Sequence, residues 1–347
     1  MSTVSATAPT ATDAPTPAVG PAAATPTGAP VTDLTTFPFP FRDEIYRYSA
    51  NLEPGGKEVP TAAGAWGREV IVVDAHYEAE LAERARILDR DPTRHASSPH
   101  MRTAEWDALT HVLGRLAADR PETFRLTRSG HDFHWENDLT GQQLDFTWGD
   151  DRSVPGGPLK FLSSQVQEDV ALLDQREGSL WLDAGVVTFA ADWSMGFDTG
   201  MRFQEIHGPV PRVHAERIIA RAEQFMMRLE PGEAYRRTNW TLTVDRKLDT
   251  STETYPEWGP DRTAVLDMTG EEAARRVHLR VEVQHIVRLP HSGAVMFLIR
   301  SYLEPIHRLA QVPEWRESMA RVIAELPEDM ADYKGIIGYR HVLTDWL

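Results

Sequence analysis

Cysteine is absent from the 347 residues of this chain. Its absence excludes disulfide bonds, cysteine-ligated iron–sulfur clusters and zinc sites, and thiolate-ligated haem within the chain. A bound metal ion must therefore be held by His, carboxylate, Tyr or Met side chains. If the protein is a redox enzyme, an iron–sulfur electron carrier has to be part of another polypeptide.

Long apolar runs are absent as well. No run reaches the roughly 18–20 residues that a membrane-spanning helix needs. No basic region followed by an apolar block marks a secretory signal near the N-terminus. We therefore expect a cytoplasmic protein that does not insert into a membrane.

Basic residues are in the minority, since 36 Lys and Arg face 52 Asp and Glu, which gives a formal net charge of −16. An acidic surface repels the phosphate backbone, so a nucleic-acid partner is not expected. The same charge suits docking against a basic patch of a partner protein. A phosphate-binding loop is also missing, because Gly156-Gly157 lacks the further glycines and the lysine of such motifs.

Charged and large apolar side chains are scarce in residues 1–35, which consist mainly of Ala, Pro, Thr, Gly and Val. Such a segment cannot bury enough surface to offset the entropy of ordering it. We predict a disordered tail over residues 1–35, with a docking tail as the alternative. A single domain is predicted over residues 36–347.

The hydrophobic pattern predicts helices first and strands later. Helical periodicity predicts helices over residues 75–89, 102–118, 158–175, 211–229 and 313–326. Strand signals cover residues 180–190, 201–206 (a short, mixed segment), 238–244, 277–289 and 294–303. Helices followed by antiparallel strands around one helix favour the α+β class over alternating α/β.

The strand predicted over 277–289 carries polar residues at alternate positions. One face is apolar, and the other presents His278, Arg280, Glu282, Gln284 and Arg288. This polar face is either solvated, as is common in antiparallel sheets, or lines a cavity. Arginine would suit a carboxylate or a propionate there, because its fork donates two hydrogen bonds. His285 interrupts the apolar face, and we expect it to be a hydrogen-bonded core residue.

Two histidine contexts stand out among the 13 histidines. His131 and His134 have a spacing that could share a metal ion, but no third ligand is evident nearby, which favours a structural or exposed role. His207 follows Ile206 and precedes Pro209 and Pro211, and this constrained loop could hold an imidazole in one orientation. Nearby apolar residues could form the walls of a haem slot: Trp193, Phe197, Met201, Phe203, Phe225 and Met226. The residues alone leave a structural role for His207 as the alternative.

Three segments in order carry a family resemblance. They are Trp193 to Pro211 with Ile206-His207-Gly-Pro-Val-Pro211, then Arg237-Thr-Asn-Trp240, then Arg280 to Pro290. Together with Gln167-Glu-Asp169, they resemble the alpha subunits of haem-dependent oxidative N-demethylases, which are also known from bacterial dimethylamine monooxygenases. The resemblance covers roughly residues 40–340.

The resemblance implies a PAS-like antiparallel sheet that binds haem b through a histidine. It also implies a monooxygenase that uses molecular oxygen to remove a methyl group from an amine as formaldehyde. Electrons would come from NAD(P)H through flavin and iron–sulfur carriers on a reductase or ferredoxin partner. Under this reading His207 is the axial iron ligand, with His214 as runner-up. The other candidates are Trp193, Phe203, Arg280 and Arg288 for haem binding, and Arg237, Asn239 and Gln284 for holding oxygen or substrate.

Other functions stay open at this point. The chain could be a PAS-type module that senses a haem or small ligand without turnover, a fold retained without haem, or a catalyst of a different haem oxidation in a biosynthetic pathway. No output domain or coiled-coil linker is visible, which favours the enzyme over the sensor. Departures from the family pattern are the tail and His285, where the family usually has a small polar residue. The amine is not revealed.

Overall fold

The computed structural model describes residues 31–42, 46 and 49–347. Residues 1–30, most of the tail predicted to be disordered, lie outside the described residues. Leu34–Thr36 forms a short 3-10 helix, capped by the Asp33 carboxylate, which accepts from the Thr35 backbone N–H at 2.9 Å. The single domain over residues 36–347 stays a prediction.

A seven-stranded sheet forms the centre of the described chain, with neighbouring strands antiparallel throughout and the order β1-β10-β11-β12-β8-β9-β4. Two small sheets pair β2 with β3, and β5 with β6 and β7. The strand bounds are β1 Glu53–Pro54, β2 Val59–Pro60, β3 Ala65–Trp66, β4 His95–Ser97, β5 Phe124–Ser129, β6 Asp132–Asn137, β7 Gln142–Thr147, β8 Asp169–Arg176, β9 Ser179–Val186, β10 Ala234–Val244, β11 Val277–Arg288 and β12 Val295–Pro305.

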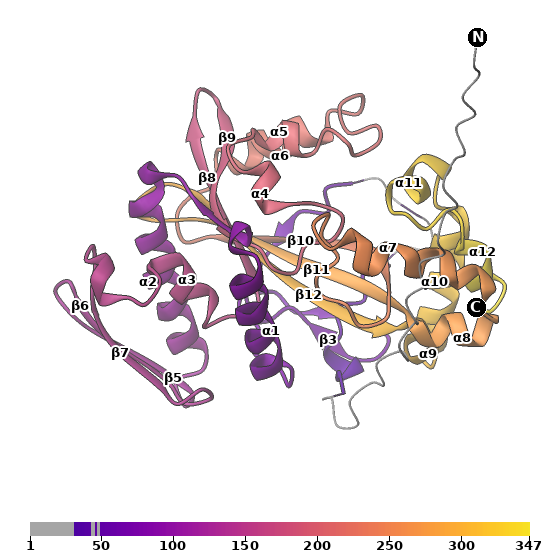
Figure 1. The fold of residues 1–347 in the computed structure, drawn as a ribbon, viewed down its shortest axis with the longest axis horizontal. Helices are drawn as coiled ribbons and strands as arrows, with labels where there is room; N and C mark the ends of the chain where they lie inside the picture. Colours follow the sequence, from indigo (N-terminus) through magenta and orange to yellow (C-terminus); the bar gives the residue numbers. More distant parts are fainter. Residues whose placement is uncertain (1–30, 43–45, 47–48) are drawn as a thin grey trace, which may run out of the picture. The chain divides into compact units, whose positions relative to one another are not determined.

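The three longest strands, β10, β11 and β12, run side by side through the middle of the sheet (Figure 1). The predicted strands over 277–289 and 294–303 correspond to β11 and β12, and a turn at His291-Ser292 joins them as expected. In the turn, the buried Asp107 carboxylate accepts from the backbone N–H groups of His291 and Ser292, both at 2.8 Å.

The helices around this sheet, apart from α7, form three groups. Their bounds are α1 Tyr77–Arg90, α2 Arg102–Asp119, α3 Pro158–Ser163, α4 Met195–Asp198, α5 Phe203–Ile206, α6 Ile218–Met226, α7 Tyr255–Ala264, α8 Gly270–Arg276, α9 Ile306–Leu309, α10 Pro313–Glu325, α11 Glu328–Tyr333 and α12 Arg340–Thr344. The first group, α1 to α3, shares one core with β5 to β7 and is the predicted N-terminal helical layer. The C-terminal helices α8 to α12 share a second core with the end of β10 and the start of β11.

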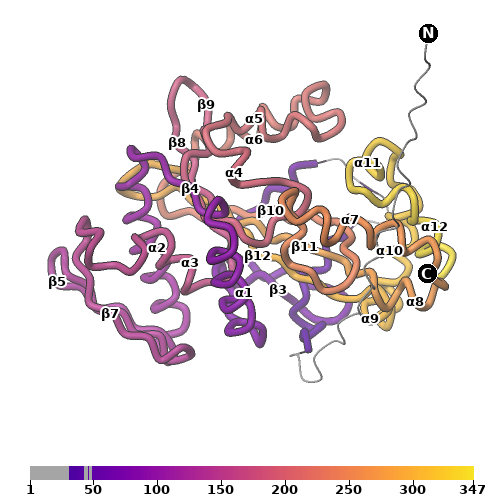
Figure 2. The backbone as a smooth tube through the Cα atoms, viewed as in Figure 1, coloured from indigo at the N-terminus to yellow at the C-terminus, as the bar shows by residue number. Residues whose placement is uncertain are grey.

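The third group, α4 to α6, packs with β8 and β9 and with one end of β11 and β12 around a third core. Figures 1 and 2 show this segment lying together on one side of the long strands. The functional site described below belongs to this group, because α5 and α6 face the sheet here.

Three predicted elements are wrong in extent or type. The helix over 158–175 ends at Ser163, and β8 begins at Asp169. Most of β8 is buried on both faces, and such a continuous apolar run cannot be told from a buried helix by periodicity. The segment over 201–206 forms helix α5 in place of a strand.

The helix over 211–229 covers only Ile218–Met226. Arg212 and Arg217 have φ angles of 61° and 54°, and this left-handed backbone interrupts a right-handed helix. In α1 the fully buried residues are Tyr77, Glu80, Arg84 and Ile87. Of the predicted face, Leu81 and Leu88 are half-buried and pack against the same core, whereas Ala85 is exposed, so the prediction is wrong for Ala85. Glu80 and Arg84 face inward because they join a buried ion-pair network.

The α+β class with a large antiparallel sheet and flanking helices is confirmed. The PAS-like character of the sheet stays a prediction. Within the described residues, every helix is too short or too polar to cross a membrane.

Candidate functional site

A cavity of about 300 Å³ lies between the sheet and helices α5, α6 and α11. This volume is at the lower end of the range for small-molecule and cofactor sites, about 300–1,000 Å³. One part of its wall is apolar and comes mainly from α5, α6, β8, β9 and β12, with Leu173, Leu182, Phe203, Ile219, Met226, Phe297 and Ile299 among its residues. The polar part comes from β10, β11 and the C-terminal end of α11.

Six of the eight candidate side chains named from the sequence line this cavity. They are Trp193, Phe203, His207, Arg237, Asn239 and Gln284. These residues are as much as 91 positions apart in the sequence, and the sheet and the α4–α6 segment bring them together. Their roles in binding or catalysis stay predictions.

Four polar side chains form the wall on the sheet. Arg237 of β10 lies opposite Gln284 of β11, and Asn239 lies opposite Glu282. Residues opposite each other in an antiparallel pair project to the same face, so these four side chains share the cavity face. Gln284 Nε2 donates to Glu282 Oε2 at 3.0 Å. The alternation of side chains along β10 and β11 therefore places a polar patch on the sheet side of the cavity.

His207 follows α5 directly and is held by a backbone hydrogen bond. Its Nδ1 lies 2.8 Å from the Phe203 carbonyl oxygen, which can only accept, so Nδ1 carries the proton. Burial lowers the pKa of His207 to about 4, so the imidazole is neutral at pH 7. Nε2 then carries a lone pair, and no hydrogen-bond partner for it occurs in the described residues. A neutral imidazole with one nitrogen anchored in this way is suited to binding a metal.

Phe203 and α5 are fixed by several contacts. The Phe203 and His207 rings lie 4.3 Å apart, and Phe203 stacks on Phe297 of β12 at 6.3 Å. The backbone N–H of Arg202 donates to the Glu205 carboxylate at 2.9 Å, which satisfies a donor at the start of α5. These contacts set the orientation of the imidazole relative to the sheet.

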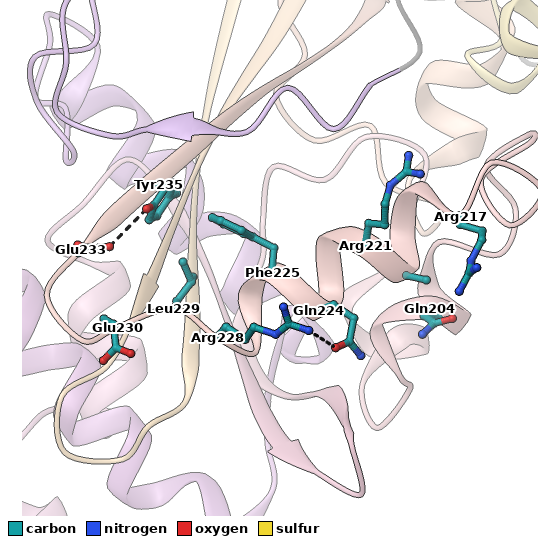
Figure 3. Close-up of a pocket in the computed structure, with 11 residues that line it drawn as sticks. Gln204, Arg217, Arg221, Gln224, Phe225, Arg228, Leu229, Glu230, Glu233 and Tyr235 are labelled. Atoms are coloured by element: carbon teal, nitrogen blue, oxygen red, sulfur yellow. Dashed lines mark hydrogen bonds between the residues drawn. The ribbon is translucent and has the colours of Figure 1, made fainter.

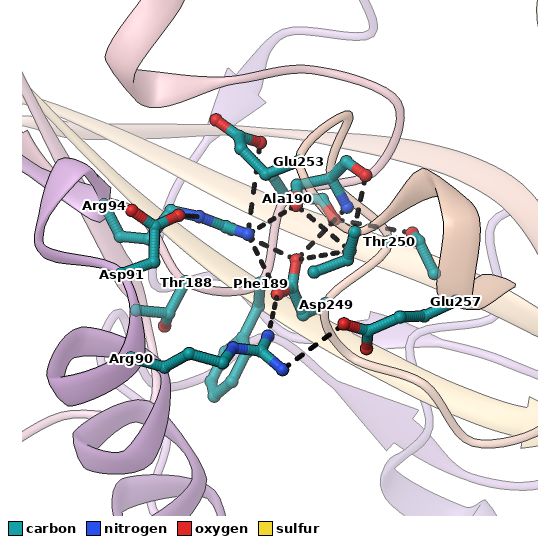
Figure 4. Close-up of polar contacts among 12 residues, drawn as sticks. Arg90, Asp91, Arg94, Thr188, Phe189, Ala190, Asp249, Thr250, Glu253 and Glu257 are labelled. Carbon is teal, nitrogen blue, oxygen red and sulfur yellow. Dashed lines mark hydrogen bonds and ion pairs between the residues drawn. The ribbon is translucent and has the colours of Figure 1, made fainter.

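Trp193 is positioned by a second network. The Asp192 backbone N–H donates to the Thr250 carbonyl at 2.9 Å, and Asp192 has a φ angle of 60°. Figure 4 shows how the neighbouring loop is pinned: Arg94 donates to both oxygens of Asp249 at 3.1 Å, and Thr250 bonds back to Ala190. The loop thus braces the chain from the end of β9 to the cavity wall.

Arg280 and Arg288 do not line the cavity. Arg280 is fully buried, donates to the carbonyls of Leu248 and Phe189, and pairs with Glu282 at 3.3 Å between Nε and Oε1. Arg288 donates to the Gly293 carbonyl at 2.5 Å and to the Met226 carbonyl at 3.1 Å. Arg280 therefore acts behind the cavity wall, where it holds the Glu282 carboxylate.

The solvated-face interpretation of the strand over 277–289 is wrong. His278, Arg280 and Glu282 are buried, and Gln284 and Arg288 are half-buried. Because β11 is a central strand with helices or loops over both faces, its polar face has no bulk water to solvate it. His285 lies in the core as expected, but neither of its ring nitrogens has a hydrogen-bond partner among the described residues.

The match to known protein families covers most of the chain. Residues 62–344 match the family described as haem-dependent oxidative N-demethylase, alpha subunit-like. The chain belongs to this family. The description of the family names haem as its cofactor.

The cavity residues fit a haem group in three respects. His207 offers an unengaged Nε2, the α5–α6 side supplies apolar and aromatic walls, and Arg237 and Lys334 supply positive charge inside the cavity. Haem needs a firm axial ligand, an apolar slot and compensation of its two propionate charges. In this member of the N-demethylase family, His207 would hold the iron. His214 is exposed and does not line the cavity.

Lys334, at the end of α11, is a site residue that the sequence reading missed. Its Nζ donates to the Trp240 carbonyl at 2.6 Å and lies 4.7 Å from the centre of the Trp240 ring. Its pKa is lowered to about 8, chiefly by burial; the charge of Glu282 opposes this shift and the charge of Arg237 adds to it. Neither α11 nor any motif around Lys334 is marked in the sequence, so no signal could have identified it.

Two other clusters are less suited to a cofactor. His134 is bonded at both ring nitrogens, to Asp145 at 2.7 Å and Glu136 at 3.0 Å, and the hydrogen bond to Asp145 is the main reason that its pKa is raised. It is therefore not a free metal ligand. His100, Asp174 and Asp183 lie close together, but Arg176 already pairs with both carboxylates.

A surface groove of about 630 Å³ runs along the other side of α6 (Figure 3). All five charged side chains that line it are exposed, namely Arg217, Arg221, Arg228, Glu230 and Glu233. Although its volume exceeds that of the cavity, it lacks a buried histidine and apolar enclosure. It is therefore a candidate contact surface and not a haem site.

Proposed function

We propose that this protein is a haem-dependent monooxygenase that removes a methyl group from an amine as formaldehyde. Membership of the N-demethylase family supports this proposal at the level of cofactor and reaction class. The observation that carries it is the cavity itself, in which the anchored neutral His207 faces the polar side chains of β10 and β11 across apolar walls.

Within this proposal, His207 Nε2 would hold the iron of haem b, and Phe203 and Trp193 would line the haem slot. The Phe203 carbonyl keeps the proton on Nδ1, which leaves the Nε2 lone pair directed away from the backbone. When bound, the haem supplies the activation of molecular oxygen and the oxidation of the methyl C–H bond. An imidazole donates less electron density than a thiolate, so hydrogen-bond donors in the cavity gain importance.

Arg237, Asn239 and Gln284 are the donors that we assign to oxygen and substrate. The Asn239 and Gln284 amides can each donate and accept, which suits an amine nitrogen in either protonation state. Glu282 is already paired with Arg280 and bonded to Gln284, so it orients the Gln284 amide. The apolar wall excludes water from the reacting methyl group.

The reaction needs electrons from outside this chain. A methylamine, one O₂, two electrons and two protons give a carbinolamine and water, and the carbinolamine collapses to formaldehyde and the demethylated amine. With no cysteine, this chain can hold no cysteine-ligated iron–sulfur cluster. We assign electron supply from NAD(P)H to flavin and iron–sulfur carriers on partner chains.

The groove on α6 is our proposed contact surface for the electron carrier. One side of α6 lines the cavity through Ile219, Ala222 and Met226, whereas the other carries Arg221 into the groove (Figure 3). A carrier bound there would be separated from the cavity by the width of one helix. The net charge of −16 favours a basic partner face, but docking depends on the charges at the contact. The arginines of the groove favour an acidic face on the partner.

The test is reconstitution with a flavin reductase, a ferredoxin, NADPH, oxygen and a panel of secondary and tertiary methylamines. We expect formaldehyde in proportion to the NADPH consumed. If the haem is reduced and binds oxygen but no amine in a broad panel is demethylated, the proposed reaction is wrong. A ligand sensor or another haem oxidation would then describe the chain better.

A further inference from the structure

Arg237 differs from the other arginines in the interior. Each fully buried arginine has a carboxylate partner: Arg84 with Asp169, Arg94 with Asp249, Arg236 with Glu53, Arg280 with Glu282 and Arg300 with Glu80. Arg237 lines the cavity and has a buried Nε without a hydrogen-bond partner, and no ion pair joins it to any described residue. Burial lowers the pKa of Arg237, and the attracting charge of Glu282 opposes this shift, but Glu282 forms its ion pair with Arg280. The half-buried Arg237 guanidinium is therefore available to an anionic group of a ligand.

Lys334 adds a second positive charge to the same cavity. One hydrogen bond, to the Trp240 carbonyl, is its only hydrogen bond to a described residue, and its ammonium group can donate three. The two cations repel each other, and the charge of Arg237 accordingly lowers the pKa of Lys334. An anion between them would relieve this repulsion.

The described carboxylates that line the cavity are already engaged. Glu282 accepts from Arg280 and from Gln284, and Asp192 pairs with Arg262 at 2.7 Å. Neither carboxylate forms an ion pair with Arg237 or Lys334. The cavity therefore presents two positive charges to whatever it binds.

We propose that Arg237 and Lys334 form a binding site for a carboxylate group of a ligand inside the cavity. The planar guanidinium fork matches the two oxygens of a carboxylate, and the ammonium group of Lys334 adds a point charge. The site accepts either a haem propionate, in which case Arg237 holds the cofactor and leaves oxygen to Asn239 and Gln284, or the carboxylate of an N-methylated amino acid substrate. This second source rests on the proposed function, whereas the binding site itself does not.

The first experiment uses the haem-free protein and needs no turnover. Hexanoate and hexanol are titrated into the wild type by calorimetry, because the two probes share an alkyl chain and differ in charge. We expect hexanoate to bind at least about tenfold more tightly, a preference that Arg237→Met and Lys334→Met each reduce and Arg237→Lys partly restores. Arg152→Met is the matched control, since Arg152 is 91% exposed. Equal binding of both probes to the wild type overturns the proposal, as does a preference that persists in both Met variants.

The second experiment identifies the source of the carboxylate. Haem and its dimethyl ester, in which both propionates are neutral, are titrated into the same variants and followed by Soret absorbance. If propionate is the source, the wild type binds haem at least about tenfold more tightly than the ester, and Arg237→Met removes the difference. If the substrate is the source, haem and ester bind equally. N-methylglycine then perturbs the haem spectrum at lower concentration than dimethylamine, and Arg237→Met removes that preference.

These outcomes separate the carboxylate site from the proposed reaction. If the protein selects carboxylates through Arg237 but releases no formaldehyde from any amine, the carboxylate site is supported and the demethylase function is contradicted. In the opposite case the protein demethylates amines but does not discriminate hexanoate from hexanol, haem from its ester, or N-methylglycine from dimethylamine. The demethylase function is then supported and the carboxylate site is contradicted. The thermal stability of the haem-free Met variants should equal or exceed that of the wild type, because each substitution removes a charge that lines the cavity without an ion-pair partner among the described residues.

Discussion

His207 owes its suitability as an iron ligand to a single backbone hydrogen bond, from its Nδ1 to the Phe203 carbonyl. We expect His207→Ala to lose haem or to change its Soret spectrum to that of a weakly ligated form. His214→Ala should leave haem binding unchanged, because His214 is exposed and outside the cavity. Titration with hemin to one equivalent measures both. The reverse pattern, with only His214→Ala altered, would transfer the assignment.

His285 is a buried histidine that lowers the free energy of unfolding. Burial lowers its pKa to about 3, from an ordinary value of 6.5, and both ring nitrogens lack partners. An unsatisfied buried donor or acceptor costs about 1–3 kcal/mol, so we expect His285→Leu to raise the free energy of unfolding by about 1 kcal/mol at pH 7.

The advantage of His285→Leu should grow as the pH falls. The folded state favours neutral His285 and the unfolded state takes up a proton near pH 6.5, so the wild type loses stability between about pH 6.5 and pH 3. The Leu variant lacks this contribution. Urea unfolding at pH 7 and pH 5 measures the effect, with the exposed His131→Leu as control. A constant difference between the two pH values would show that His285 does not titrate as described.

The sequence identified much of the cavity because its residues belong to short ordered motifs. Arg237 and Asn239 stand two positions apart on β10, and Gln284 lies on the polar side of a clearly alternating strand. Lys334 could not be found in this way, because it reaches the cavity from the end of a short helix 94 residues beyond its partner Trp240. Hydrophobic periodicity does not predict the loops around the sheet. These loops decide which arginines line the cavity and which lie behind its wall.

Strand β11 depends on a buried charged pair on its polar face. Arg280 is fully buried and holds Glu282 while donating to two backbone carbonyls. Breaking a buried ion pair by removing one partner costs about 3–5 kcal/mol. We expect Arg280→Met to lower the free energy of unfolding by this amount in urea titrations. The exposed Arg152→Met should change it by less than about 0.5 kcal/mol. A near-neutral Arg280 variant would contradict the buried role.

Elements whose apolar residues recur with a clear helical or strand period were predictable, and a strand with a continuous apolar run was not. Helix α2 and strands β11 and β12 match their predicted ranges closely, because alternation or helical spacing is unambiguous there. The sequence predicts a helix where β8 begins, because Val170 to Leu173 is buried throughout and its apolar run has no strand period. Helix α6 was overextended because the left-handed backbone at Arg212 and Arg217 leaves no mark in the hydrophobic pattern.

The charge of the whole molecule and the charge of its proposed contact surface have opposite signs. The chain carries a net charge of −16, yet Arg217 and Arg221 in the α6 groove form no ion pair with any described residue (Figure 3). The groove is lined by three arginines and two glutamates, so its charge is weakly positive on a strongly acidic molecule, and an acidic carrier should bind there in preference to the rest of the surface. Net repulsion elsewhere would then discourage docking away from α6.

Reversing charge in the groove tests this preference directly. We expect Arg221→Glu combined with Arg228→Glu to slow haem reduction by an acidic ferredoxin and its reductase at least about tenfold at low salt, since steering by charge changes association rates by about 10–10³-fold. The difference should shrink as salt is raised, because the screening length falls to about 8 Å near physiological ionic strength. Arg152→Glu changes one charge of the same sign far from α6 in sequence and should have little effect. Reduction by dithionite and binding of hemin should be unaffected in the double variant, because neither arginine lines the cavity. Equal ferredoxin-driven rates in the wild type and the double variant at low salt would place the electron carrier elsewhere, and a faster double variant would indicate a basic partner.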